Sequence, residues 1–270
     1  MTGASPSVRR SAGFGSGALT LARRFGPPVV VLIGVLLVWQ LIAFGPGRRV
    51  VPAPTVIASA LGSNSGVLFR STSATFFEAI GGLVIGTLMG LLVAFATARW
   101  ASARQLLLPV AVAASVIPII AVAPILNNWF GVLNPLSKMA MASLLVFFPV
   151  VVNVTRGLVE VQPSQLELMR AYAATDNEVL RKVRIPNMLP FFFTAMKVAV
   201  TLAFIGALVG EYFGGTSEVL GRVVLQSMSN GSFDLAWAAI LIGALTAIVG
   251  YLVVSLVERM AIPWAVLAEG

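Results

Sequence analysis

The sequence has 270 residues and a net charge of +8, with 58% hydrophobic and only 10% charged residues, whereas a soluble domain is typically about 25% charged. This composition excludes a globular domain that faces water on all sides, and it predicts an all-α, polytopic membrane protein. Cysteine and histidine are absent, which excludes disulfides, thiolate and imidazole catalysis, and the usual zinc ligands.

The first 26 residues are polar, rich in Ser and Gly, and basic, which predicts a disordered cytoplasmic tail. The apolar run PPVVVLIGVLLVWQLIAF, residues 27–44, follows this tail. A basic region before an apolar run is also the pattern of a secretory signal peptide. An uncleaved membrane span is the favoured interpretation, because the run is long for a signal core and no small-x-small cleavage site follows closely.

Five further apolar runs are predicted to cross the membrane, since a span needs about 20 apolar helical residues. They lie near residues 76–97, 106–125, 139–154, 191–210 and 235–257. Pro118 and Pro124 predict that the second of these runs is kinked or ends early. The resulting six helices define a transmembrane domain over residues 27–260, followed by a C-terminal tail over residues 261–270.

Lysine and arginine lie mostly in short segments beside the apolar runs, where they set the orientation in the membrane and do not indicate nucleic-acid binding. With both termini in the cytoplasm, most of the basic residues lie on the inner side. The outer side then carries only Arg48, Arg49, Arg70, Lys138 and Arg222. Lys197 lies within the fifth predicted span, and its long side chain is expected to reach the inner surface.

A charged segment, ELMRAYAATDNEVLRKVRIPNMLP, residues 167–190, separates two apolar runs on the predicted cytoplasmic side. Ser164 is followed three residues later by Glu167, and Thr175 is followed three residues later by Glu178. Each pair is a capping-box pattern, in which the hydroxyl and the carboxylate satisfy free backbone N–H groups at a helix start. The segment therefore predicts two short helices.

The first short helix is expected over residues 165–174 and the second over residues 176–185, where Pro186 would end it. Glu178 and Lys182 are spaced i,i+4 in the favourable order on the second helix. Because neither helix is long enough to be stable alone in water, each is expected to dock onto the rest of the protein or onto a partner. A solvated amphipathic loop remains the alternative, and a DNA-binding helix-turn-helix is disfavoured by the flanking spans.

The same segment resembles the EAA motif of binding-protein-dependent ABC importer permeases. Glu167 matches the acidic residue of that motif, and Ile185 and Pro186 match its closing hydrophobic-Pro pair at the expected distance. Ala174 and Thr175 stand where the motif usually has Ala and Ser.

This sequence departs from the EAA motif at three positions. Leu168 and Met169 replace the two alanines, and Ala173 replaces the glycine. The glycine allows a tight turn between the two helices of the motif. Alanine is the smallest substitute, so the turn is expected to form here as well.

Three other stretches are similar to the nitrate/sulfonate/taurine branch of this permease family. They are VPAPTVIASAL at residues 51–61, IPIIAVAPILNNWFGVLNPLSK at residues 117–138 and GEYFGGTSEVLG at residues 210–221. Together with the EAA-like segment they follow one another in the family's order over about residues 50–260.

The resemblance implies a type I ABC importer permease fold and a permease subunit that imports a small organic or inorganic solute across a bacterial inner membrane. It implies three protein partners: cytoplasmic ABC ATPase subunits that bind ATP-Mg, a second permease copy or paralogue, and an extracytoplasmic solute-binding protein. The residues expected to couple the permease to the ATPase are Glu167, Arg170, Ala173, Ala174, Thr175, Glu178, Ile185 and Pro186.

A few polar and aromatic residues in or beside the apolar runs are candidates for a substrate path. They are Asn127, Asn128, Phe147, Asn153 and Glu211. Each has a structural alternative. Asn127 and Asn128 could hydrogen-bond to backbone groups freed by Pro124, and Phe147 and Asn153 could pack in the core. Glu211 could lie at the level of the lipid headgroups. The identity of the substrate is not readable from the sequence.

The sequence contains no Gly-x4-Gly-Lys-Ser/Thr phosphate loop, so ATP hydrolysis is expected in another polypeptide. An intramembrane enzyme is disfavoured because histidine is absent and acidic residues are few and scattered. The chain is therefore expected to be a transport subunit, not an enzyme, and to hold no cofactor or metal itself. A secondary transporter or channel with a structural cytoplasmic loop remains the alternative, and a non-transporting membrane scaffold is a third class.

Overall fold

The computed structural model describes residues 16–43 and 50–266, and every regular element in these ranges is a helix. This confirms the all-α class. The contacts divide the chain into two units, residues 1–57 and residues 58–270, which we describe one at a time.

The first unit consists mainly of helix α1, Ser16–Ala43. Its residues Gly26–Ala43 are apolar enough to cross a membrane, and none of them is buried by other parts of the protein. Most of the predicted N-terminal tail lies outside the described residues, but its last part, from Ser16, is helical. The side chain of Gln40 donates to Thr55 Oγ1 at 2.9 Å, which links α1 to the start of α2, Pro54–Ser63.

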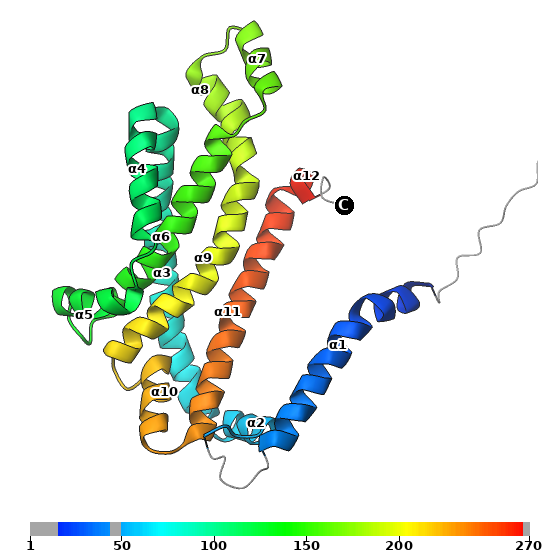
Figure 1. The fold of residues 1–270 in the computed structure, drawn as a ribbon, viewed down its shortest axis with the longest axis vertical. Helices are drawn as coiled ribbons and strands as arrows, with labels where there is room; N and C mark the ends of the chain where they lie inside the picture. Colours follow the sequence, from blue (N-terminus) through cyan, green and yellow to red (C-terminus); the bar gives the residue numbers. More distant parts are fainter. Residues whose placement is uncertain (1–15, 44–49, 267–270) are drawn as a thin grey trace, which may run out of the picture. The chain divides into compact units, whose positions relative to one another are not determined.

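The second unit is a bundle of long helices with short helices at its ends (Figure 1). Its elements after α2 are α3 (Ser65–Arg99), α4 (Ala101–Ala114), α5 (Ile119–Phe130), α6 (Pro135–Val159), α7 (Pro163–Ala171), α8 (Asp176–Val179), a π-helical turn (Leu180–Arg184), α9 (Ile185–Phe213), α10 (Leu220–Ser229), α11 (Phe233–Ala261) and α12 (Pro263–Val266).

Helix α6 is the centre of the bundle because small residues let its neighbours approach it closely. A Cβ atom added to Gly82 of α3 would lie 2.3 Å from the Cβ of Ala142, and one added to Gly206 of α9 would lie 2.6 Å from its Cα. Ala142 is thus held between two glycines on two different helices. Close backbone approach at small residues is the usual way in which membrane helices associate, because lipid offers no hydrophobic driving force between them.

The described residues contain five helices long and apolar enough to cross a membrane, within residues 26–43, 65–99, 135–159, 176–213 and 233–261. The remaining predicted span, residues 106–125, is not one helix but is divided between α4 and α5. Pro118, in extended conformation, precedes α5, and a proline disfavours helical geometry in the residue before it. The predicted interruption at Pro118 is confirmed, whereas Pro124 lies inside α5.

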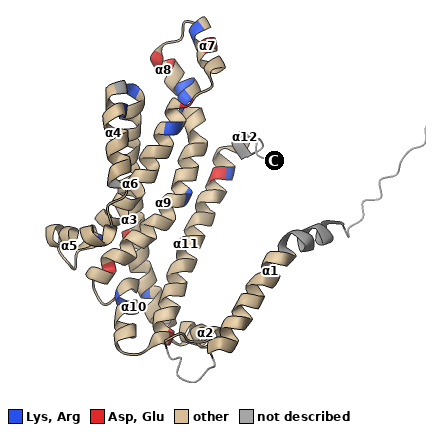
Figure 2. Cartoon of the chain, viewed as in Figure 1, with Lys and Arg blue, Asp and Glu red and all other residues tan. Residues whose placement is uncertain are grey.

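Charged side chains gather towards the two ends of the bundle, and the middles of the long helices are largely uncharged (Figure 2). Lys197 of α9 is an exception. Its Nζ donates to Glu258 Oε2 of α11 at 2.8 Å, and the two side chains are only 23% and 13% exposed. The lysine therefore has an acidic partner inside the protein. We expected its side chain to reach the inner membrane surface and did not predict this partner.

Candidate functional site

Helices α7 and α8 project from one end of the bundle (Figure 1). We call residues 163–184 the α7–α8 element; it comprises α7, the turn after it, α8 and the π-helical turn. Every residue of α7 and α8 is at least partly exposed. The element therefore has a solvent-facing surface of its own beyond the ends of the spans.

The turn between α7 and α8 is a Schellman motif, a common helix C-terminus closed by two backbone hydrogen bonds. The N–H of Ala173 donates to Arg170 O at 2.9 Å, and the N–H of Ala174 donates to Met169 O at 3.0 Å. Ala173 has a φ of +50°, the only positive φ of a non-glycine among the described residues. The expected turn thus forms with alanine in the left-handed conformation that glycine adopts most easily.

The second predicted capping box is confirmed at the start of α8. Thr175 is the N-cap residue; its Oγ1 accepts the N–H of Glu178, and its own N–H donates to Glu178 Oε2 at 3.0 Å. The Lys182 ammonium pairs with the same glutamate at 3.2 Å, as the i,i+4 spacing predicted. Helix α8 is therefore fixed at its first residue immediately after the turn.

The first predicted capping box is wrong. Helix α7 begins at Pro163, with Gln162 as its N-cap residue and no side-chain capping hydrogen bond, so Ser164 lies inside the first turn. Proline favours the first helical position because its fixed φ suits a helix and its missing N–H would be unpaired there anyway. That preference places the helix start one residue ahead of the serine.

Pro186 does not end the second short helix, contrary to the prediction. Residues 176–213 form one continuous helical segment of 38 residues, with a π-helical turn over Leu180–Arg184 immediately before the proline. In an α-helix the ring of Pro186 would clash with the carbonyl of Lys182. In the π-helical turn the Ile185 N–H donates to Leu180 O, five residues back. The wider turn shifts the Lys182 carbonyl relative to the Pro186 ring, and the helix continues as α9.

The base of the α7–α8 element is attached to the bundle by hydrogen bonds to the end of α6. Asn187 Nδ2 donates to Gly157 O at 2.7 Å and to Glu160 O at 3.1 Å. These carbonyls at the C-terminal end of α6 thereby gain donors that the helix itself does not supply. Movement of the element is consequently linked to α6 as well as to α9.

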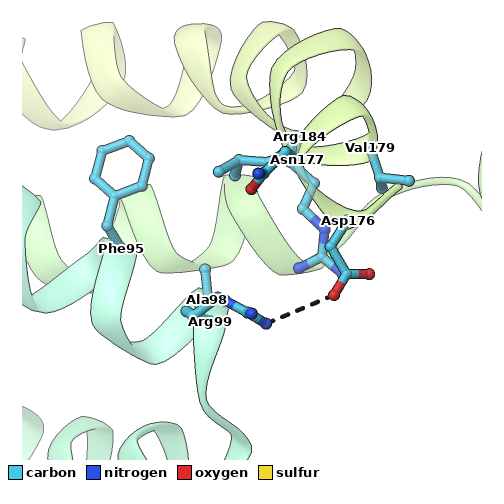
Figure 3. Close-up of a pocket in the computed structure, with 8 residues that line it drawn as sticks. Phe95, Ala98, Arg99, Asp176, Asn177, Val179 and Arg184 are labelled. Carbon is cyan, nitrogen blue, oxygen red and sulfur yellow. Dashed lines mark ion pairs between the residues drawn. The ribbon is translucent and has the colours of Figure 1, made fainter. Parts of the chain in front are cut away.

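A pocket of about 250 Å³ lies between the end of α3 and α8 (Figure 3). Arg99 of α3 pairs with Asp176 of α8 across it at 3.6 Å, but both side chains are largely exposed. Exposed pairs contribute little to stability, about 0–1 kcal/mol. The pocket is lined by Phe95, Ala98, Arg99, Asp176, Asn177, Val179, Leu180 and Arg184.

The structure brings the eight predicted coupling residues together on the α7–α8 element and its junction with α9. Glu167, Arg170, Ala173 and Thr175 are exposed, and Ala174, Glu178, Ile185 and Pro186 are partly exposed. Leu168 and Tyr172 were not among the predicted residues, yet they are 57% and 77% exposed. Leu168 and Tyr172 are four residues apart and so lie on the same face of a helix, and this spacing could have predicted an apolar patch on the surface of α7.

The predicted substrate-path residues are distributed over three helices. On α5, Asn127 is buried and Asn128 is exposed. On α6, Phe147 packs edge-on against Phe148 at a centroid distance of 5.3 Å, and Asn153 Nδ2 donates to Pro149 O of its own helix at 2.8 Å. Glu211 of α9 is buried and accepts the Gly221 N–H. Their contact with substrate stays a prediction.

A family model described as "Binding-protein-dependent transport system inner membrane component" matches residues 82–265. This match covers well over half of the chain, so the protein belongs to that family. It is a multi-pass membrane permease subunit of a binding-protein-dependent importer of the ABC class. The EAA-like segment lies within the matched residues.

Three curated relatives match most of this chain. A probable ABC transporter permease protein of Haemophilus influenzae is 34% identical over 79% of this chain and 87% of its own. The formylaminopyrimidine transport permease protein ThiX of Halalkalibacterium halodurans is 30% identical over 88% and 95%. The riboflavin transport system permease protein RibX of Chloroflexus aurantiacus is 30% identical over 98% and 97%. Sulfonate and taurine permeases also match, at lower identity.

Two solved transporters have a similar fold. A chain of a bacterial ABC transporter involved in import of the acidic polysaccharide alginate aligns with a TM-score of 0.60 at 13% identity, over 90% of this chain and 99% of its own. A chain of the inward-facing MetNI methionine ABC transporter aligns with a TM-score of 0.56 at 18% identity, over 72% and 93%. These likenesses confirm the expected type I ABC importer permease fold.

Proposed function

We propose that this permease is driven by a separate cytoplasmic ATPase that docks on the α7–α8 element of a bacterial inner-membrane importer. The observation that carries the proposal is this projecting helix pair, which presents an exposed apolar patch beside charged residues and is attached at its base to α6 and α9. ATP with magnesium would bind to the ATPase, because the sequence lacks a phosphate loop.

Leu168 and Tyr172 are the apolar centre of the proposed docking surface. Exposed aromatic side chains that become buried in a complex often dominate its binding energy, and truncating one typically costs 2 kcal/mol or more, about 30-fold in affinity. Glu167 and Arg170 lie on the same helix and would form a charged rim. Rim charges mainly set the rate and specificity of association.

The proposed orientation places the α7–α8 element and both termini in the cytoplasm. The basic residues of this end of the bundle support it, since inner loops carry the excess of lysine and arginine. A second copy or paralogue of the permease would complete the translocation path, and a solute-binding protein would deliver the substrate at the opposite end, where α10 lies.

We propose a small nitrogen heterocycle as the substrate class. The support is that two relatives of about equal similarity are named for transport of formylaminopyrimidine and riboflavin, both of which are heterocyclic compounds. Uptake of a labelled pyrimidine by cells that express the whole transporter, with sulfonates as competitors, tests this assignment. Competition by sulfonates but not by pyrimidines would contradict it.

The docking proposal is tested by co-purifying the solubilised permease with candidate ABC ATPases from the same genome. We expect Tyr172→Ala and Glu167→Lys to release the ATPase, while Glu218→Lys, an exposed glutamate between α9 and α10, leaves binding unchanged. An ATPase that binds none of these proteins, wild type included, together with uptake that follows an ion gradient without ATP, would instead indicate a secondary transporter.

A further inference from the structure

A group of ionisable side chains is buried where α3, α6 and α9 meet at the end of the bundle opposite the α7–α8 element. Glu78 of α3 is 5% exposed, and Lys138 of α6 and Glu211 of α9 are fully buried. The three side chains interact electrostatically with one another. We call them the Glu–Lys–Glu cluster. Ionisable residues inside a membrane bundle are costly and have a specific role by default.

Fixed hydrogen-bond donors and a nearby cation surround the Glu211 carboxyl group. Its Oε2 accepts the Gly221 N–H at 2.7 Å, and Gly221 lies in the first turn of α10, where the helix dipole favours a negative charge. A Cβ atom on Gly221 would lie 2.7 Å from the Glu211 Cβ, so only glycine permits this approach. The Lys138 ammonium supplies a nearby positive charge.

The surroundings of Glu78 are different. Its carboxyl group interacts with the carboxyl group of Glu211, and two carboxylates that share a buried site repel each other unless a proton lies between them. Within the described part of the chain, Glu78 Oε2 and Glu211 Oε1 are both buried without a hydrogen-bond donor. A buried carboxylate oxygen without a donor carries a substantial free-energy cost.

We infer that Glu78 is protonated and donates a hydrogen bond to the Glu211 carboxylate, so that the Glu–Lys–Glu cluster is a buried proton-binding site. The proton comes from water, makes Glu78 neutral, and gives each of the two orphaned oxygens a partner. Glu211 keeps its negative charge, which Lys138 balances. The cluster is then neutral in total, as a site enclosed by apolar helices requires.

The protonated cluster also holds α10 on the bundle. The Leu220 N–H donates to Thr75 Oγ1 at 3.0 Å, and the Thr75 hydroxyl contacts Glu211. The first two N–H groups of α10 are therefore fixed to α3 and α9 through the side chains that surround the proton. Other charges on the packed elements are Arg222 of α10, whose side chain lies near Gly215, and Asp234 in the first turn of α11.

The inference predicts an asymmetry between the two glutamates. Glutamine is neutral and has an N–H donor, so Glu78→Gln imitates the protonated acid, and we expect its thermal unfolding temperature to stay close to wild type. Glu211→Gln removes the negative charge that balances Lys138 and replaces one of the two acceptor oxygens with an N–H donor, and we expect a clearly lower unfolding temperature. Glu218→Gln, at an exposed position nearby, is the matched control and should behave as wild type.

The proton is detected directly by infrared spectroscopy of the full-length protein in lipid nanodiscs, where a protonated carboxyl group absorbs at higher frequency than a carboxylate. We expect a protonated-carboxyl band at neutral pH in wild type and in Glu218→Gln, and its loss in Glu78→Gln. A spectrum of Glu78→Gln that matches wild type would overturn the inference, as would a Glu78→Gln protein as unstable as Glu211→Gln.

The pH dependence of unfolding gives a second readout. The folded chain would retain a proton that the unfolded chain releases at neutral pH, so wild-type stability should fall as pH rises, by at most about tenfold in the unfolding equilibrium constant per pH unit. Glu78→Gln should lose this contribution to the slope. An unchanged slope in Glu78→Gln would also contradict the proton site. Neither measurement depends on ATPase docking or on transport.

Discussion

At the scale of single residues, Ala173 occupies the position at which the EAA motif has glycine, and it adopts the left-handed conformation that glycine favours. A left-handed conformation costs a non-glycine residue roughly 1–2 kcal/mol, and glycine avoids this cost. Glycine loses more backbone entropy on folding, however, which offsets about 0.5–1 kcal/mol of the gain. We expect Ala173→Gly to stabilise the turn by about 0.5–1 kcal/mol. Slower hydrogen exchange of the Ala174 amide would show this, and Ala171→Gly, inside α7, should have the opposite effect.

A second residue-scale prediction concerns the close contacts of α6. Gly82→Ala puts a methyl group 2.3 Å from the Ala142 Cβ, so the helices must separate, which typically costs about 1–3 kcal/mol. The unfolding temperature of the solubilised protein should fall. Gly62→Ala in α2, where an added Cβ meets nothing within 4 Å, is the control, and an equal loss there would contradict the packing argument.

Single residues were predictable where the interaction is local. The Thr175–Glu178 box and the Glu178–Lys182 pair need only their own spacing in one helix, and both are present. Ser164 failed because proline competed for the same helix start. The partner of Lys197 was unpredictable, because Glu258 is distant in sequence and only tertiary packing of α9 against α11 brings it near.

At the scale of elements, the two helix starts of the α7–α8 element should respond differently to the same kind of change. Removing an N-cap hydroxyl costs about 0.5–2 kcal/mol, so Thr175→Ala should speed hydrogen exchange in the first turn of α8. Ser164→Ala should leave α7 unchanged, because that hydroxyl caps nothing. Equal effects of the two substitutions would contradict the observed boundaries.

Long apolar elements were predictable from composition and length alone, and their ends were not. Apolar run length located the spans of α3, α6, α9 and α11, but each of these helices extends beyond its predicted apolar limits on both sides, by 2 to 11 residues. The interruption at Pro118 followed from proline chemistry. The passage of the helix through Pro186 did not, since it depends on a π-helical turn that no simple spacing rule indicates.

At the scale of the whole bundle, the Lys197–Glu258 pair joins the helix that follows the α7–α8 element to the last long helix. Removing one partner of a largely buried ion pair leaves an unpaired charge and costs about 3–5 kcal/mol, whereas replacing both with apolar residues can be neutral. We therefore expect Lys197→Met and Glu258→Leu each to lower the unfolding temperature, and the double variant to recover much of the loss. Additive losses would contradict a direct pairing.

The unbroken helical segment from residue 176 to residue 213 has a mechanical consequence. With 38 residues and a rise of 1.5 Å per residue, this rod is about 57 Å long, almost twice the roughly 30 Å of the hydrocarbon core. One end belongs to the α7–α8 element, and the other carries Glu211. If this segment rotates about a point within the bilayer, a displacement of α8 in one direction moves the end that carries Glu211 in the opposite direction. The π-helical turn and Pro190, which lies inside α9, are places near its base where this segment can bend, so stiffening or softening them should change how much movement reaches the far end.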